Sequence, residues 1–222
     1  MTFSLLGRCA RTGRLGMVVS SSSPAVAARC AHVRPRVGVA ASQNVTDPRL
    51  GPALLAALER TRDARRAVEE VVASHPHMRH RQLVLLGPHG DAHAYTGEGA
   101  LGRHGHLVGT DCAAAGNLLA DEAVPGAMVE AFDGARDEDL GPRLLRALEA
   151  GLDAGGEAGD VRSAGLLIGG DVDWPVADLR VDWHDAPIAE LRAVWEVYAP
   201  QLEDYLTRAL DPDAAPGYGV PE

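Results

Sequence analysis

Short apolar runs separated by polar turns mark the first quarter of the chain. Residues 2–8 and 15–20 are rich in apolar side chains, and residues 11–14 between them have the composition of a hairpin turn. A third run, 37–42, is rich in glycine and alanine, which indicates that another layer packs closely against it. The segment 26–30 fits a strand and a helix equally. The pattern predicts an antiparallel β region that begins with the first run.

Later in the chain the apolar spacing takes the helical period, and helices then alternate with strands. Asp63 is a good N-cap, and Pro76 ends the helix that follows it. The predicted helices are 53–60, 63–75, 123–132, 140–152 and 187–210. The predicted later strands are 83–86, 92–96, 108–115, 164–168 and 178–182, of which the first three form one group.

Runs of strands alternate with pairs of helices, and this order argues for a layered α+β domain rather than a parallel, doubly wound sheet. The sequence contains no internal repeat and no linker that would divide it. We therefore expect one domain over residues 2–210. The remaining segment, 211–222, contains three prolines and two glycines, and we expect it to be disordered.

The composition excludes several classes of function. The 222 residues carry a formal net charge of −10, so binding of nucleic acid, which needs a basic face, is disfavoured. Apart from histidine, every basic side chain is an arginine, and the sequence has no lysine. The absence of lysine excludes Schiff-base catalysis and any lysine-assisted nucleophile.

The sequence also points to a compartment. It shows no basic segment that leads into an apolar run, and no stretch long and apolar enough to span a bilayer. Cys9, Cys30 and Cys112 are scattered and have no spacing typical of metal ligands, which favours reduced thiols over a disulfide framework. We expect a cytoplasmic protein without a membrane partner.

The second residue is a candidate nucleophile. Methionine aminopeptidases remove an initiator Met1 when the next residue is small, as Thr2 is. A free Thr2 would carry a hydroxyl and an α-amine on one residue, and this amine, which titrates at roughly 7.7–8.0, can take the hydroxyl proton. The alternative interpretation of these residues is an ordinary loose chain end.

Several motifs together resemble the bacterial family called domain of unknown function 1028. The resemblance covers roughly residues 2–195, and its Gly-Asn and Leu-Arg-Val-Asp stretches are the more specific motifs in combination. The motifs are Thr2-Phe3-Ser4, Gly13 to Ser20, Gly38 to Gln43, Asp47-Pro48, Arg81-Gln82, Thr96-Gly97, Gly116 to Ala120, Asp178 to His184 and Pro187 to Leu191.

The resemblance implies membership of the N-terminal nucleophile (Ntn) hydrolases. Their fold is a four-layer αββα sandwich, in which two antiparallel sheets lie between two helical layers and the first strand carries the nucleophile. Family members tend to read Gln-Ser-Ala where this chain has Arg162-Ser163-Ala164, so a role for a glutamine there does not carry over. Some members carry an added carboxy-terminal domain thought to bind peptidoglycan, and we expect none here.

A threonine nucleophile needs a proton acceptor, donors for the developing oxyanion and a group that orients the amine. The α-amine of Thr2 is the acceptor. Relatives of the proteasome type place a lysine beside the nucleophile, and this chain has none. Ser20 and Ser22 follow the second predicted strand and are candidates for a supporting polar partner. A solvated serine loop is the alternative.

Asn117 is the candidate oxyanion-hole residue, because an uncharged amide at a strand end suits a developing negative charge. It fits a helix N-cap or a left-handed turn residue equally well. Gln43 and Asn44 could bind substrate amides or form a turn. Asp182 and His184 share a face if both lie on one strand, and could orient a proton carrier or pair structurally.

The sequence leaves three functions open. The first is an Ntn-type amidohydrolase in which Thr2 cleaves an amide, a cyclic amide or a short peptide through an acyl-enzyme, without a metal or other cofactor. The second is a non-catalytic member of the fold that binds a ligand or a partner. The third is a metal-assisted hydrolase that uses some of the nine histidines. We also expect a homo-oligomer, specifically a dimer, because the amphipathic last helix offers a surface.

Overall fold

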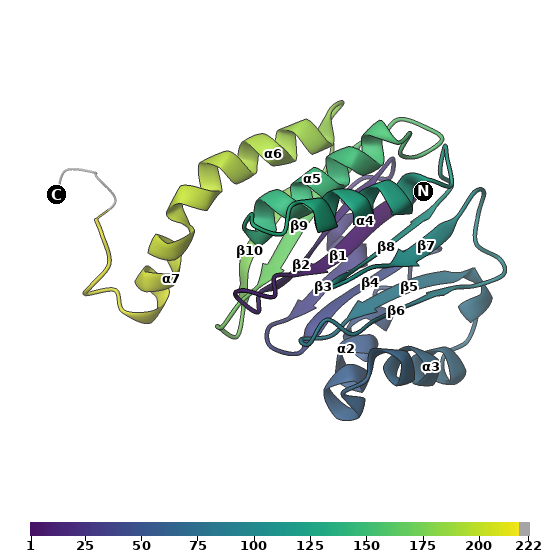
Figure 1. The fold of residues 1–222 in the computed structure, drawn as a ribbon, viewed down its shortest axis with the longest axis horizontal. Helices are drawn as coiled ribbons and strands as arrows, with labels where there is room; N and C mark the ends of the chain where they lie inside the picture. The colour runs from purple at the N-terminus through teal and green to yellow at the C-terminus, as the bar shows by residue number, and fades with distance from the viewer. Residues whose placement is uncertain (218–222) are drawn as a thin grey trace.

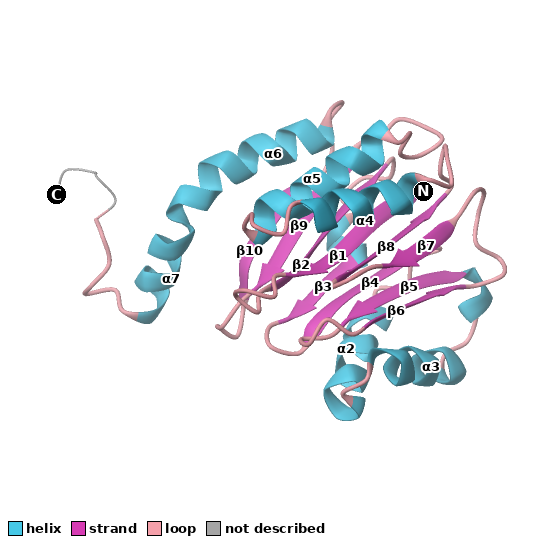
Figure 2. Cartoon of the chain, in the orientation of Figure 1, coloured by secondary structure: helices cyan, strands magenta, loops and turns pink. Residues whose placement is uncertain are grey.

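The strands form two antiparallel sheets in this computed structural model, which describes residues 1–217. Thr2–Arg8 (β1) lies in the middle of the larger sheet, and the cartoon shows both sheets stacked face to face (Figure 2). The larger sheet has the order β10 (Pro175–Val181), β9 (Ser163–Gly169), β2 (Leu15–Ser21), β1, β8 (Cys112–Asn117), β7 (Gly105–Val108). The smaller sheet has the order β3 (Ala31–Arg34), β4 (Gly38–Asn44), β5 (Arg81–Leu86), β6 (Ala92–Thr96).

Helices cover the outer face of each sheet, as Figure 1 shows. Over the larger sheet lie α4 (Val124–Gly134), α5 (Leu140–Asp153) and α6 (Pro187–Tyr198). Against the smaller sheet lie α2 (Leu50–Thr61) and α3 (Ala64–Ser74). The short elements are α1 (Ala27–Cys30), the 3-10 turns η1 (Met78–His80) and η2 (Ala199–Gln201), and α7 (Leu202–Leu210). The expected four-layer αββα arrangement of two antiparallel sheets between helices is confirmed.

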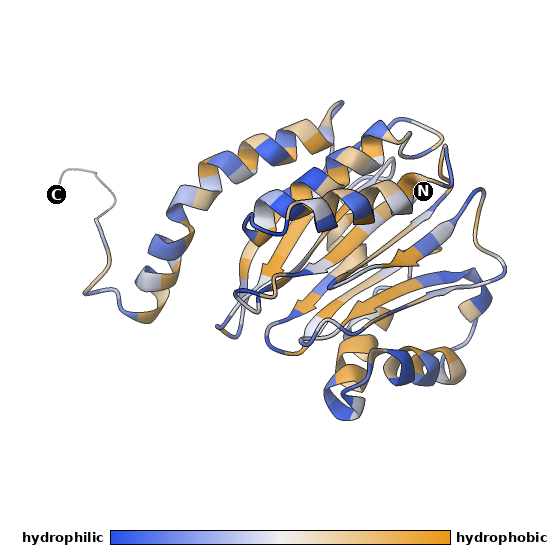
Figure 3. Cartoon of the chain, in the orientation of Figure 1, coloured by the Kyte–Doolittle hydropathy of each residue, from blue (hydrophilic) through white to orange (hydrophobic). Residues whose placement is uncertain are grey.

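Strand parity assigns each apolar residue of β1 to one of the layers. Phe3 and Leu5 pack under the helices of the larger sheet, whereas Leu6 points between the two sheets. Successive side chains of a strand point to opposite faces, so Thr2 and Ser4 share the inter-sheet side with Leu6. Figure 3 shows the resulting apolar strands between more polar helix surfaces. β1 is buried on both faces, so it carries apolar side chains on both of them.

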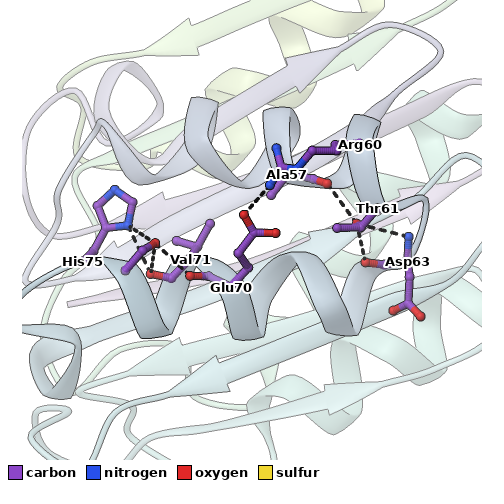
Figure 4. Close-up of polar contacts among 8 residues, drawn as sticks. Ala57, Arg60, Thr61, Asp63, Glu70, Val71 and His75 are labelled. Atoms are coloured by element: carbon purple, nitrogen blue, oxygen red, sulfur yellow. Dashed lines mark hydrogen bonds and ion pairs between the residues drawn. The ribbon is translucent and has the colours of Figure 1, made fainter.

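The turn between α2 and α3 illustrates how local capping builds the lower helical layer (Figure 4). The Asp63 carboxylate accepts the Arg66 N–H at 3.0 Å, which confirms the predicted N-cap. Thr61 donates its hydroxyl to the carbonyl of Ala57 at 2.9 Å. An ion pair between Arg60 and Glu70 joins the two exposed helix surfaces.

The single predicted strand 108–115 is wrong. The chain forms β7 and β8 there, and Asp111 between them has a left-handed backbone with φ 57°. Both strands belong to the larger sheet, because β8 pairs with β1, and not to the group of β5 and β6. The small side chains of Ala113 and Ala115 lie on the face of β8 that packs against the smaller sheet.

Two further expectations need correction. The strands of the first quarter do not form one region, since β1 and β2 belong to the larger sheet and β3 and β4 to the smaller one. The single helix expected over 187–210 is interrupted at Ala199–Gln201, because Pro200 provides no backbone N–H and clashes with the preceding turn. Leu191, Trp195 and Leu202 of its predicted apolar face are buried.

The end of the described chain carries little regular structure. The expected disordered segment, 211–222, lies partly outside the described residues, and its described part forms turns after α7. Within residues 1–217, every helix is too short or too polar to cross a bilayer.

Candidate active site

Thr2 opens the central strand of the larger sheet and is almost buried. It lies at the start of β1, between β2 and β8, and only 4% of its surface is exposed. Its partner in the ladder with β8 is Asn117, the last residue of that strand. The topology therefore brings together two residues that are far apart in the sequence and that the sequence analysis had singled out.

A row of polar side chains crosses four strands at this end of the sheet. Phe3 pairs with Ser20 on β2, which puts Ser21 beside Thr2, and Ser21 in turn pairs with Ser163 on β9. These serines are buried. A strand ladder places directly opposed residues on the same face, so the row points toward the second sheet. The row runs Ser163, Ser21, Thr2, Asn117.

The carbonyl oxygen of Met1 is the acceptor at the centre of this row. The hydroxyl groups of Thr2 and Ser21 both donate to it. The hydroxyl of Ser21 also accepts the backbone N–H of Ser23 at 3.0 Å, which fixes its position. Two hydroxyl groups from adjacent strands thus converge on the peptide bond that joins Met1 to Thr2.

Glu157 contributes a buried carboxylate to the same region. It follows α5, is 5% exposed, and accepts the backbone N–H of Ser22 at 3.1 Å on both oxygens. Burial raises the pKa of Glu157, and hydrogen bonds from Ser22 and the positive amino terminus act in the opposite direction. An isolated bridge to Leu119 holds the Glu157 backbone beside the end of β8.

A hydrogen-bond network below Thr2 ties the two sheets together. The Ser4 hydroxyl donates to Gln43 Oε1 at 2.7 Å, and Gln43 Nε2 donates to Gln82 Oε1 at 2.8 Å. Asn117 Nδ2 donates to the same oxygen of Gln82 at 3.2 Å. Gln82 itself donates to the carbonyl of Gly116 at 3.0 Å. Because the network is fully buried, its hydrogen bonds fix the orientations of the side-chain amides of Gln43, Gln82 and Asn117.

One polar atom of the network makes no hydrogen bond within the described residues. That atom is Asn117 Oδ1, which is buried. An unpaired buried acceptor is costly, which makes its place beside Thr2 informative. The backbone next to it is also unusual, since Leu118 adopts a left-handed conformation with φ 51°. Strain of this kind clusters at functional sites.

The predicted supporting serines take different positions. Ser20 shares the parity of Val18, which packs in the helical layer, and its hydroxyl donates to the carbonyl of Ser163 at 2.9 Å. Ser22 contributes its backbone N–H to Glu157. Ser21, between them, is the serine whose hydroxyl lies beside Thr2.

The remaining candidates occupy structural positions. Gln43 belongs to the inter-sheet network. Asn44 has φ 72° and donates Nδ2 to the carbonyl of His80 at 2.6 Å, which is a turn role. Asp182 and His184 do not share a strand, because β10 ends at Val181, and both are exposed. The condition under which they would share a strand face is therefore not met.

Ser21, Glu157 and Gln82 are the site residues that the sequence analysis did not select. Ser21 lies two residues after Val19, so the two side chains share one face of β2. Only the register of β2 against β1 shows that this face brings Ser21 beside Thr2. Glu157 follows a glycine pair and carries no motif of its own. Only the packing of that loop against the end of β8 brings it near Thr2.

Across residues 1–217, no three His, Cys, Asp or Glu side chains are grouped closely enough to hold a metal ion. His104 and His106, the pair with the most ligand-like spacing, are both exposed, and His106 Nδ1 lies 2.9 Å from the Thr96 hydroxyl.

Comparisons with known proteins place the chain in a family. A family described as "Family of unknown function (DUF1028)" matches residues 2–191. The crystal structure of a DUF1028 protein from Silicibacter pomeroyi is similar, with 31% identity, a TM-score of 0.82 and coverage of 89% of each chain. None of the curated proteins matches this chain.

More distant likenesses are to Anbu (ancestral beta-subunit) proteins. The one from Yersinia bercovieri has 13% identity, a TM-score of 0.41 and coverage of 98% of this chain and 100% of its own. The Gly-1 mutant from Hyphomicrobium sp. strain MC1 has 12% identity, a TM-score of 0.44 and coverage of 99% and 100%. These values are too low to support an argument about the site. The match over most of the chain and the closely similar crystal structure show that this protein belongs to the DUF1028 family.

Proposed function

We propose that this protein is an Ntn-type amidohydrolase with Thr2 as its nucleophile. The observation that carries the proposal is the convergence of the Thr2 and Ser21 hydroxyl groups on the Met1 carbonyl at the start of the central strand. Removal of Met1 would leave the Thr2 hydroxyl and a free α-amine in this buried row. A hydroxyl with an amine base on the same residue is a recognised activated nucleophile.

The reaction has two steps. In the first, the α-amine of Thr2 takes the hydroxyl proton, Oγ1 attacks the amide carbonyl, and the proton passes to the departing amine as the C–N bond breaks. In the second, water attacks the resulting ester, the same α-amine takes a proton from the water, and Oγ1 recovers it on release. Neither step needs a lysine, a metal or another cofactor.

Ser21 and Asn117 take separate parts in this proposal. The Ser21 hydroxyl already points at a carbonyl oxygen bound to Thr2, which makes it the better oxyanion donor. The Asn117 amide nitrogen donates to Gln82, and its unpaired Oδ1 is an acceptor. We therefore assign Asn117 the role of holding the N–H of the free Thr2 amine, in place of the oxyanion role expected from the sequence.

The first test is the intact mass of protein purified without an N-terminal tag. We expect the loss of one methionine, and retention of Met1 would exclude this mechanism for that form. The Met1-free protein is then assayed on a panel of amino acid p-nitroanilides, with and without N-acetyl groups. Thr2→Ala should abolish turnover, whereas the exposed control Thr110→Ala should not.

The outcome of this comparison separates the two open functions. If Thr2→Ala and the unchanged protein are equally inactive on every amide of the panel, the non-catalytic, ligand-binding member of the fold becomes the better explanation. A residual rate that Thr2→Ala leaves unchanged would point to a contaminating hydrolase.

A further inference from the structure

Met1 lies where the acyl part of a substrate would have to lie. Its carbonyl oxygen accepts hydrogen bonds from the Thr2 and Ser21 hydroxyl groups. Within Thr2, the nitrogen and Oγ1 are separated only by Cα and Cβ, so an acyl group on either atom occupies overlapping space. The Met1 residue, which is an aminoacyl group on the nitrogen, therefore approximates an aminoacyl group on Oγ1.

A buried carboxylate near Met1, that of Glu157, would stabilise the ammonium of an aminoacyl group bound there. The Glu157 carboxylate is almost entirely buried, and no arginine or histidine of residues 1–217 forms an ion pair with it. The Met1 ammonium lies beyond ion-pair distance but acts on Glu157, because it lowers the pKa that burial raises. A buried carboxylate without a counter-charge is costly and is stabilised by a cation brought to it.

The sulfur of Met1 lies near Gly159, which lines an open cavity. A Cβ placed on Gly159 would have the Met1 sulfur as its one neighbour, at 4.0 Å. Gly159 and Glu157 both line a cavity of about 590 Å³, whose lining also includes the apolar residues Leu152, Pro187 and Ile188 and the acidic residues Asp160 and Asp185. Apolar side chains and carboxylates thus both line the cavity next to the Met1 sulfur, and Glu157 is one of these carboxylates.

We propose that the substrate is an aminoacyl amide or short peptide with a free amino terminus and an apolar first side chain, bound where Met1 lies, with its ammonium facing Glu157. This inference rests on the proposed function of Thr2. The Oγ1–carbonyl bond forms as the C–N bond breaks, and the departing amine receives the Oγ1 proton. Water then replaces Oγ1 on the carbonyl, so one amide and one water give one free amino acid and one amine.

The test compares two probes on the Met1-free protein, L-methioninamide and N-acetyl-L-methioninamide, by calorimetry with the Thr2→Ala variant to prevent turnover. Because acetylation removes the ammonium, we expect the free amine to bind about tenfold or more tightly than the acetylated probe. Glu157→Gln should remove this difference. Equal binding of the two probes, or no binding of either, would overturn the inference.

A second variant keeps the test independent of the buried glutamate, whose replacement could disturb folding. Gly159→Leu places a side chain in the space of the Met1 sulfur, so it should weaken L-methioninamide more than glycinamide. Equal weakening of both probes would contradict the assignment of the side-chain site. Thermal unfolding of each variant shows whether the fold is intact.

Turnover distinguishes this inference from the proposed function. If L-methioninamide binds with the expected preference but no p-nitroanilide is cleaved, the recognition site stands and the catalytic proposal fails. If N-acetylated p-nitroanilides are cleaved as fast as the free amines, the catalytic proposal stands and the substrate assignment fails. With both correct, Glu157→Gln raises KM for L-methionine p-nitroanilide and changes the N-acetylated substrate much less.

Discussion

Thr2 and Asn117 are register partners at one end of the larger sheet, and the unpaired Oδ1 of Asn117 is buried beside the residue that would become the amino terminus. The other amide atom of Asn117 is held by Gln82, which reaches across from the smaller sheet. The orientation of Asn117 therefore depends on the packing of one sheet against the other.

Gln82→Leu should destabilise the protein. Gln82 Oε1 accepts hydrogen bonds from Gln43 Nε2 and Asn117 Nδ2, and its loss leaves both of these buried donors without that acceptor. We expect the free energy of unfolding to fall by about 2–4 kcal/mol. Urea denaturation measures the change, with Gln201→Leu, whose side chain is exposed and bonds to Val197, as the matched control. A change below about 0.5 kcal/mol for Gln82→Leu would show that the network is not coupled to folding.

Gly7→Ala should be costly and Gly126→Ala should not. A Cβ on Gly7 would lie 2.5 Å from the Phe132 ring, so the ring must shift at a cost of about 1–3 kcal/mol. A Cβ on Gly126, in α4, meets nothing within 4 Å, and helix propensity predicts a gain of about 0.5–1 kcal/mol. The midpoints of thermal unfolding should move in opposite directions. A shift in the same direction would contradict the packing of β1 against α4.

Burial of His32 should make stability depend on pH. Burial lowers the pKa of His32 below 6.5, and its buried Nε2 has no partner in the described chain. The folded state then binds the proton less well than the unfolded chain. The His32 contribution is complete above pH 6.5 and is lost as the pH falls through the lowered pKa.

We expect the free energy of unfolding to decrease between pH 7.5 and pH 5.5, and His32→Gln to reduce that decrease. Urea titrations at each pH measure it, with the exposed His89→Gln as control. If proton NMR shows that His32 titrates above 6.5 in the folded protein, the sign of the prediction is wrong.

Light scattering should show a dimer. The apolar side chains of α6 and α7 form an exposed face, on which Val197 is 70% and Tyr205 is 40% exposed. In Figure 1 these helices extend beyond the sheets. Exposed apolar patches of this kind mark interaction sites. Val197→Asp should give a monomer and the neighbouring control Glu196→Ala should not, whereas a monomeric unchanged protein would contradict the expectation.

Local pattern was enough to identify most of the elements. The apolar runs at β1, β2, β5 and β9 and the N-cap at Asp63 were predicted from periodicity and capping alone, because burial and local hydrogen bonding leave a direct mark on the sequence. The four-layer architecture was predicted only through the family resemblance. Strand order on its own did not require it.

The candidate site shows which residues the sequence alone can identify and which need the tertiary structure. Thr2 could be singled out because its chemistry depends on its position at the chain start. Ser21 could not, since choosing it over Ser20 and Ser22 requires the register between β1 and β2, and a shift of one residue would turn it to the other face.

The sequence by itself determined most of the strands and helices, the acidic charge without lysine, and the candidate nucleophile at Thr2. Only the tertiary structure decided that β8 lies beside β1, that Gln82 fixes Asn117 from the other sheet, and that Glu157 is buried next to the amino terminus. The physical reason is that these contacts join segments distant in the sequence, whose pairing depends on how whole layers pack rather than on any local preference.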